Sequence, residues 1–293
     1  MKNRTLALLA SACILVACQE KQTTPETSIR FYARETLTKT VFGDLTDGKY
    51  PILWQEGDYV ALSYKMGTTA SASVTPSVDG KTAEFILPGE LIDGSESGNV
   101  YYALSPASAQ KKINTDFYRW QLQIPAIQVP SAGSVDPSAQ ILYARYDAGA
   151  VEPASVPFEF EHVTAYGLVS FSNLSLEEGE EITGVTLTAA VGWVGTWYYY
   201  VKDSTHDESF HPAGSMVAGG VSCDLNIVTS SSSGIWFACA PVDLQNKTLT
   251  AKIKTNLGTY TKVVTFPAES GTFLPGYVAR FTINMSGVER VVE

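Results

Sequence analysis

The chain has 293 residues, of which 45% are hydrophobic, 17% charged and 11% aromatic. This composition is typical of a globular protein, and the length allows one or two domains with a sizeable core. The formal net charge is −10, and no cluster of basic residues stands out in the sequence. Without a basic patch to neutralise phosphates, nucleic acid is not expected as a partner.

The N-terminus has the features of an export signal. Lys2 and Arg4 precede an apolar run of twelve residues, 6–17. A membrane-spanning helix needs about 20 residues, so the run predicts a signal peptide over residues 1–17. Its end, LVAC, resembles the lipobox of bacterial lipoproteins. The resemblance implies cleavage before Cys18 and lipidation of Cys18, whereas Cys13 is discarded with the signal.

The residues that follow Cys18 are predicted to form a tether. Their sequence, QEKQTTPETS, is polar and poor in apolar side chains, as expected of a flexible linker over residues 18–28. Several acyl chains on one cysteine hold a protein firmly in a membrane. We therefore expect an outer membrane lipoprotein, with a lipid anchor at Cys18.

Beyond the tether, the sequence alternates between apolar and polar residues with a period of two. This pattern predicts strands with one buried face, and it recurs between clusters of Gly, Pro, Asp and Ser. The predicted fold class is all-β, built as sandwiches. About a dozen short strands favour two domains, and the stretch at 149–160 favours a boundary between them. We predict an N-terminal sandwich over 29–155 and a C-terminal sandwich over 156–293.

A hairpin is predicted from residues 221–228 and 234–241, which flank a serine-rich turn. A register centred on Ser231 matches apolar residues on one face, opposing Cys223 to Cys239, Leu225 to Phe237 and Ile227 to Ile235. Outside the cytoplasm such a cysteine pair could oxidise to a disulfide. The alternative is two free thiols that pack as small apolar residues.

The sequence offers little catalytic chemistry. Its three histidines are His162, for which a structural hydrogen bond is expected, and His206 and His211, which lie in a polar stretch. The spacing of His206 and His211 fits no established zinc pattern, and no nucleophile, metalloprotease or phosphate-binding motif occurs. We therefore expect no catalytic residue, no metal site and no cofactor, and a protein that is not an enzyme.

The aromatic run GWVGTWYYYV, residues 192–201, is the other candidate site. Trp193, Trp197 and Tyr199 lie at even spacing, so one face of a strand could present all three. Aromatic faces stack on sugar rings, which suggests a glycan contact. The alternative is that these side chains fill a core or the joint between two domains.

Several ordered motifs resemble a known family. The lipobox is followed by SIRFYARETLTKTVF, by LWQEGDYVALSY with its Trp54-x-x-Gly57-Asp58 pattern, and by VYYALSPAS, QILYARYD, EHVTAYGLVSFS and GTFLPGYVARFTINM. Their order and spacing are similar to those of fimbrillins and fimbrillin-like proteins of Bacteroidetes, the subunits of type V pili. The resemblance covers nearly the whole chain and implies two tandem transthyretin-like β-sandwich domains.

The resemblance also implies a mechanism. In this family an Arg- or Lys-specific protease removes the first strand with its lipid, and a strand of a neighbouring subunit fills the groove by β-augmentation. Here the removable strand would be IRFYAR, with the inward residues Ile29, Phe31 and Ala33. The expected cleavage site is Arg34, ahead of Lys39 and Arg30. The alternative for Arg34 is a solvated charge at the edge of a sheet.

Two functions are therefore expected from the sequence. The first is a fimbrial subunit that serves cell adhesion, with other pilus subunits as partners through strand exchange and with surface glycans or proteins as further partners. Only VERVVE follows the last predicted strand. Either the last strands act as donor, or the protein accepts a strand without donating one, as a tip or accessory subunit would. The second function is a surface lipoprotein that binds carbohydrate and never polymerises.

Overall fold

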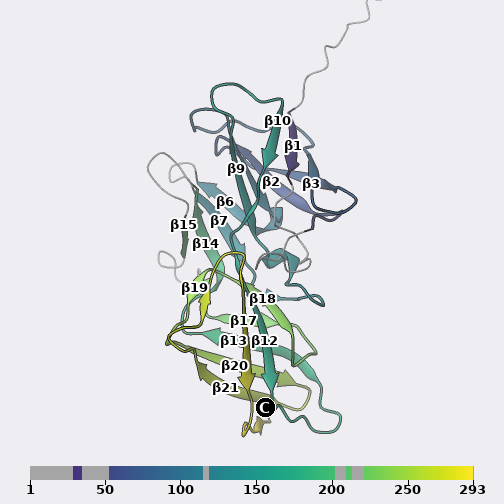
Figure 1. The fold of residues 1–293 in the computed structure, drawn as a ribbon, viewed down its shortest axis with the longest axis vertical. Helices are drawn as coiled ribbons and strands as arrows, with labels where there is room; N and C mark the ends of the chain where they lie inside the picture. Colours follow the sequence, from purple (N-terminus) through teal and green to yellow (C-terminus); the bar gives the residue numbers. More distant parts are fainter. Residues whose placement is uncertain (1–28, 35–52, 115–118, 202–208, 213–220, 293) are drawn as a thin grey trace, which may run out of the picture.

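A computed structural model describes residues 29–34, 53–114, 119–201, 209–212 and 221–292 (Figure 1). These residues form strands and two short 3-10 turns, η1 (Ala107–Ala109) and η3 (Pro137–Ala139), so the predicted all-β sandwich fold is confirmed. The signal peptide, the tether with Cys18, Lys39 and His206 lie outside the described residues. No helix among the described residues is long and apolar enough to span a membrane.

The N-terminal part of the chain forms an eight-stranded sheet with the strand order β10-β1-β4-β3-β2-β5-β9-β11. β10 also contacts β9, near the opposite end of this order, so the sheet curls around its own core. Its strands are β1 (Arg30–Ala33), β2 (Tyr59–Tyr64), β3 (Ala70–Pro76), β4 (Ala83–Ile86), β5 (Val100–Ser105), β9 (Leu142–Asp147), β10 (Ser155–Phe158) and β11 (Glu161–His162).

A second sheet joins the two parts of the chain, with the order β15-β14-β7-β6 and with β16 paired to β14. Its strands are β6 (Gln110–Asn114), β7 (Arg119–Ile124), β14 (Val194–Tyr200), β15 (Ser209–Pro212) and β16 (Val221–Ser222). The ladder between β7 and β14 runs from Gly195↔Ile124 to Tyr200↔Arg119. The domain boundary at residue 155 stays a prediction, but strands from both sides of it share this sheet.

Three further sheets complete the C-terminal part, in the orders β24-β21-β20-β13-β17-β8, β18-β12-β23 and β19-β22. Their strands are β8 (Ile127–Gln128), β12 (Ala165–Ser172), β13 (Ile182–Ala189), β17 (Asp224–Ile227), β18 (Ile235–Cys239), β19 (Val242–Asp243), β20 (Thr248–Thr255), β21 (Thr259–Thr265), β22 (Thr272–Phe273), β23 (Val278–Asn284) and β24 (Arg290–Val291).

Some strands of the eight-stranded sheet are buried on both faces, because the sheet separates two cores. In β5, the side chain of Tyr101 packs into the N-terminal core, whereas Tyr102 packs into the larger core shared with the C-terminal part. In β2, Leu62 and Ala61 divide in the same way. A strand covered on both sides has an almost continuous apolar sequence, which explains the run VYYAL.

The Trp54-x-x-Gly57-Asp58 pattern forms the turn that leads into β2. The carboxylate of Asp58 accepts a hydrogen bond from the backbone N–H of Gln55 at 2.8 Å, and Gly57 has a φ of 93°, which favours glycine. The Trp54 ring lies 5.5 Å from the ring of Phe85, centroid to centroid, within the N-terminal core. The pattern is therefore a structural turn with a core anchor.

The predicted hairpin between residues 221 and 241 is wrong. β17 pairs with β13 and β8, whereas β18 pairs with β12, so the two segments belong to different sheets. Leu225 and Phe237 are both fully buried in the shared core, which explains why their apolar patterns match without a common ladder. Cys223 is exposed, Cys239 is buried, and both thiols are free. Cys223 and Cys239 are therefore not opposed in one hairpin, and the reason for suggesting a disulfide between them is lost.

A buried carboxylate holds the last strand near the C-terminal end. Glu180 accepts hydrogen bonds from Thr255 (2.6 Å) and Tyr260 (2.9 Å), and it pairs with the guanidinium of Arg290 in β24 at 3.1 Å. Burial alone would raise the pKa of Glu180. The hydrogen bonds, including one from the backbone N–H of Glu177, and the charge of Arg290 outweigh this effect and lower the pKa to about 2.

This carboxylate should make stability depend on acid pH. Because the pKa of Glu180 is lower in the folded chain than its ordinary value of 4.5, its contribution is complete above pH 4.5 and is lost as the pH falls towards 2. We expect the Tm of the unmodified chain to fall more steeply over this interval than that of the Glu180→Gln variant. Thermal unfolding followed by circular dichroism checks this, and equal slopes would contradict it.

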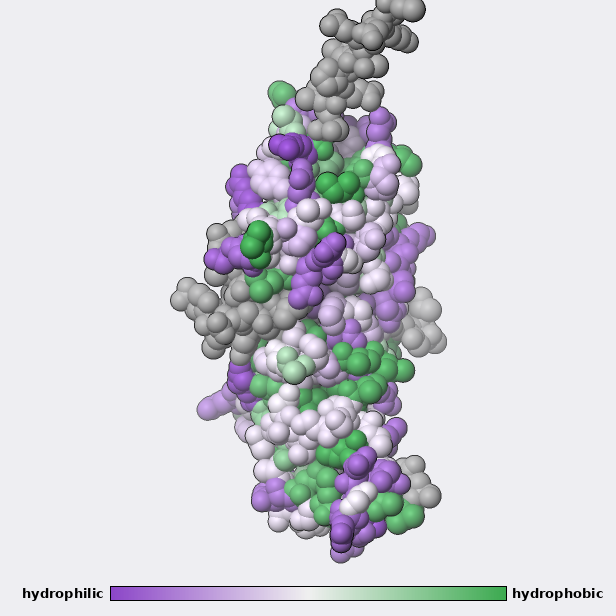
Figure 2. All heavy atoms as spheres, turned by 90° about the vertical axis from the view of Figure 1, so that its right-hand side faces the viewer, coloured by the Kyte–Doolittle hydropathy of each residue, from purple (hydrophilic) through white to green (hydrophobic). Residues whose placement is uncertain are grey.

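The surface mixes polar and apolar side chains. In the view of Figure 2, apolar groups gather mainly over the lower half of the molecule. Large exposed apolar residues of the C-terminal part include Val263, Leu274, Tyr277 and Val291.

Candidate functional site

The first strand is inserted between two strands that are distant from it in sequence. β1 pairs in parallel with β10, from Arg30↔Ser155 to Ala33↔Phe158, and in antiparallel fashion with β4, from Phe31↔Phe85 to Ala33↔Ala83. Further backbone hydrogen bonds to the β10 side continue this pairing at both ends of β1, from Arg30 N to Ala154 O and from Arg34 N to Phe158 O. β1 is therefore an interior strand of the sheet.

The side chains of β1 alternate as the sequence predicted. Phe31 is 5% exposed and Ala33 is fully buried, and Ile29 packs partly buried against the same core. The Phe31 ring lies 5.8 Å from the ring of Tyr101 and 6.4 Å from that of Phe158. Burial of one phenylalanine side chain contributes about 1.5–3 kcal/mol. The strand is thus held by core packing as well as by its two ladders.

Removal of β1 would leave a groove that only another strand can fill well. The facing backbone groups of β4 and β10 would lose their partners, and unpaired edges of this kind accept an added strand. Neighbouring strands in a sheet lie about 4.8 Å apart, and β1 lies between β4 and β10. Its removal would therefore leave a gap that is one strand wide. Phe85, Tyr101 and Phe158 would form the apolar floor of this groove.

The arginines at the two ends of β1 are accessible: Arg30 is its first residue, and Arg34 follows its last. The guanidinium of Arg34 pairs with Glu159 at 3.1 Å, and that hydrogen bond raises the pKa of Arg34. Arg30 pairs with Glu84 at 3.7 Å. The Arg34 side chain is nevertheless 53% exposed and that of Arg30 75% exposed. Exposed ion pairs of this kind contribute little to stability, so they would not shield either residue from a protease.

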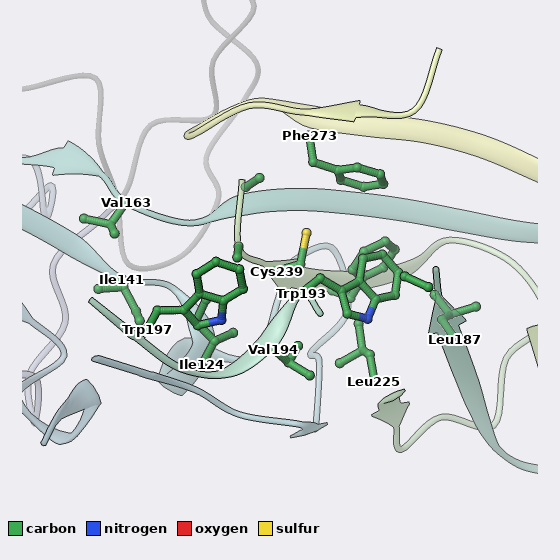
Figure 3. Packing of buried hydrophobic residues seen from close by; sticks show 14 of the residues in the cluster. Ile124, Ile141, Val163, Leu187, Trp193, Val194, Trp197, Leu225, Cys239 and Phe273 are labelled. Carbon is green, nitrogen blue, oxygen red and sulfur yellow. The ribbon is translucent and has the colours of Figure 1, made fainter. Parts of the chain in front are cut away.

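The aromatic run lies in the core. Trp193 is fully buried, Trp197 is 4% exposed and Tyr199 is 9% exposed. Figure 3 shows Trp193 and Trp197 enclosed by apolar side chains, and the indole N–H of Trp193 donates to the backbone O of Cys223 at 2.9 Å. A buried ring cannot stack on a sugar. The glycan contact suggested for these three residues is therefore corrected in favour of core packing.

The opposite face of β14 carries the more exposed side chains, which the sequence interpretation did not single out. Thr196, Tyr198 and Tyr200 are only partly buried, and Tyr200 accepts a hydrogen bond from Arg119 at 2.7 Å. Three consecutive tyrosines follow Trp197, so the aromatic pattern did not reveal which face points inward. Only the tertiary packing settles this choice.

His162 has the structural hydrogen bond that the sequence suggested. Its Nδ1 lies 2.6 Å from the hydroxyl of Tyr166. Gly276, with a φ of 77°, packs closely against the imidazole in the turn before β23. Within the described ranges, no group of three or more His, Cys, Asp or Glu side chains is arranged to hold a metal ion.

These features define an all-β sandwich protein whose N-terminal strand completes an interior position of its first sheet. No family model matches the sequence, and no curated protein matches it. Solved structures do match the fold. A candidate cell adhesion protein from Bacteroides uniformis aligns with 92% of this chain and with 98% of its own length, at a TM-score of 0.53 and 15% identity.

A second candidate cell adhesion protein, from Bacteroides ovatus, aligns with 90% of this chain and 95% of its own, at a TM-score of 0.51 and 13% identity. A fimbrial assembly protein from Parabacteroides distasonis aligns with 90% of this chain and 94% of its own, at 13% identity. Its TM-score is 0.39. At these identities the first two matches show a shared fold, which agrees with the resemblance to fimbrillin-like proteins.

Proposed function

We propose that this protein is a fimbrial subunit of the cell surface that serves adhesion and assembles by exchange of its first strand. The observation that carries the proposal is the position of β1, which is interior in the sheet yet N-terminal in the chain. Its end is followed by the accessible Arg34. The fold shared with candidate cell adhesion proteins adds support.

The geometry specifies what a replacement strand must offer. It must run parallel to β10 and antiparallel to β4, and it must place apolar side chains where Phe31 and Ala33 lie. The seat of β1 lies near the upper end of the molecule in Figure 1, and the C-terminal end of the chain is marked at the lower end. Contacts between unlike ends of successive copies generate open chains, as a fimbrium requires.

Cleavage at Arg34 is the first expected outcome. An Arg-specific protease should cut after Arg34 and convert the monomer into SDS-resistant ladders whose length grows with protein concentration. The Arg34→Gln variant should stay uncut at this bond and monomeric, whereas Arg30→Gln, at the other end of β1, should behave like the unmodified chain. Mass spectrometry of the new N-terminus and gel electrophoresis measure both effects.

The outcome of that experiment also separates the roles within a fimbrium. A cut chain that forms ladders alone both donates and accepts a strand, as a stalk subunit does. A cut chain that joins only to a different subunit accepts without donating, which suits a tip or accessory position. A cut chain that stays monomeric with every partner would refute strand exchange.

Membrane delivery through Cys18 is a separate part of the proposal. An alkyne-labelled fatty acid fed to the producing cells should be incorporated into the unmodified chain and not into the Cys18→Ala variant. We assign no catalytic activity to the protein. The alternative, a carbohydrate-binding lipoprotein that never polymerises, loses its suggested site because Trp193, Trp197 and Tyr199 are buried.

A further inference from the structure

A cavity lies at one end of the N-terminal core, beside the start of β1. Its volume is about 670 Å³, within the range of roughly 300–1,000 Å³ that is usual for sites of small organic ligands. Its walls come from β1, β4, the segment 87–93 and the ends of β2 and β5. The floor is buried and apolar, with Phe31, Phe85 and Tyr101, whereas Glu90 and Glu152 at the rim are exposed.

One polar atom in this floor lacks a partner. Tyr101 is 1% exposed, and its hydroxyl makes no hydrogen bond of standard geometry with a described residue, although the hydroxyl of Tyr64 lies close enough to influence it. The stacked ring of Tyr64 lies 4.7 Å away, but the hydroxyl of Tyr64 is already donated to Asn99 Oδ1 at 2.6 Å. Buried hydroxyl groups normally have partners, so the hydroxyl of Tyr101 is a group that a bound molecule could satisfy.

The charge of the lining favours a cation. Four carboxylates, those of Glu84, Glu90, Asp93 and Glu152, line the cavity against the single guanidinium of Arg30. Arg30 pairs with Glu84, and Lys65 pairs with Asp93 from outside. Among the described residues, Glu90 and Glu152 form no ion pair, so their charges are available to a ligand.

The chemistry of Tyr101 fits the same ligand. Burial, followed by the proximity of Tyr64 and Glu152, raises the pKa of Tyr101, so its hydroxyl stays protonated and neutral at physiological pH. A neutral phenol oxygen accepts a hydrogen bond from an ammonium group. The ring of Tyr64 already faces a cation, because the Lys65 ammonium lies 4.6 Å from its centroid.

We propose that this cavity binds a small organic cation: a protonated amine on an apolar, aromatic-sized body. The body would lie against Phe31 and Phe85, and the ammonium would lie between Glu90 and Glu152, with one N–H donated to the hydroxyl of Tyr101. The site exists only while β1 is in place, because Phe31 forms part of its wall. The proposal therefore concerns the uncut chain, and it stands whether or not strand exchange follows.

Calorimetric titration of the full chain with two matched cations tests this site. Phenethylammonium can donate N–H groups, whereas benzyltrimethylammonium has the same charge and an aromatic ring but no N–H. Both should bind saturably, and phenylacetate, the anion of similar shape, should not. The double variant Glu90→Gln, Glu152→Gln should weaken both cations by about tenfold, because the favourable charge is removed.

The variant Tyr101→Phe separates the role of the hydroxyl from that of the fold. It removes only an unpartnered atom, so the chain should keep its Tm. It should weaken phenethylammonium by about threefold to tenfold and leave benzyltrimethylammonium unchanged. Absence of saturable binding of either cation up to about 10 mM, or equal binding of phenylacetate, would overturn the proposal. Equal loss of both cations in Tyr101→Phe would overturn the assigned hydrogen bond.

Discussion

The variant Phe31→Ala is expected to lower the free energy of unfolding by about 3–5 kcal/mol, the usual cost of truncating a buried phenylalanine. Phe31 is 5% exposed and packs against the rings of Tyr101 and Phe158. A cavity left there would stay empty, because the ladders to β4 and β10 hold the backbone in place. Urea unfolding followed by circular dichroism measures the change.

The matched control is Tyr32→Ala on the same strand. Tyr32 is only partly buried, and its side chain points away from the core, so this change should cost clearly less than Phe31→Ala. Phe31→Ala should also speed cleavage at Arg34, since a weakened strand opens more often. A loss below about 1 kcal/mol for Phe31→Ala would mean that the core does not depend on β1.

The variant Gly167→Ala should destabilise the chain by about 3 kcal/mol, near the upper end of the usual cost of overpacking. Gly167 lies in β12 directly opposite Phe237 of β18, whose ring covers the glycine. An added Cβ would collide with that ring. Phe237 is fully buried and packs on Trp193, 5.6 Å away between ring centroids, so the ring has no free space to move into.

A double-variant cycle checks this explanation. Combining Gly167→Ala with Phe237→Leu should cost less than the sum of the single changes, because the smaller side chain relieves the collision. Gly89→Ala serves as the control, since nothing lies within 4 Å of a Cβ at that position. Strict additivity of the two changes would show that the contact is not the cause.

The sequence predicts the first strand well because its signal is local. Ile29, Phe31 and Ala33 alternate with polar residues, and alternation determines which side chains face a core. The partners of this strand could not be predicted in the same way. β10 lies more than a hundred residues further along the chain, and no local pattern connects it with β1.

The errors have two physical causes. Around Trp197 both faces of the strand carry aromatic side chains. The alternation was therefore visible in the sequence, but it did not show which of the two faces points into the core. Between residues 221 and 241 the apolar match was real, but it reflects strands that contribute to one core from different sheets. Two strands have matching apolar residues when they pair in one sheet, and equally when they face each other across a core from two different sheets. The acidic cavity also escaped prediction, because its lining comes from several separate segments.

The sheet shared by the two parts of the chain has a mechanical consequence. Under the proposed function the molecule would carry tension, and tension between its ends must cross from one part to the other. β7 and β14 span that crossing with consecutive residue pairs from Gly195↔Ile124 to Tyr200↔Arg119. The parts can be pulled away from each other only if this ladder breaks, so we expect the molecule to resist stretching as one unit.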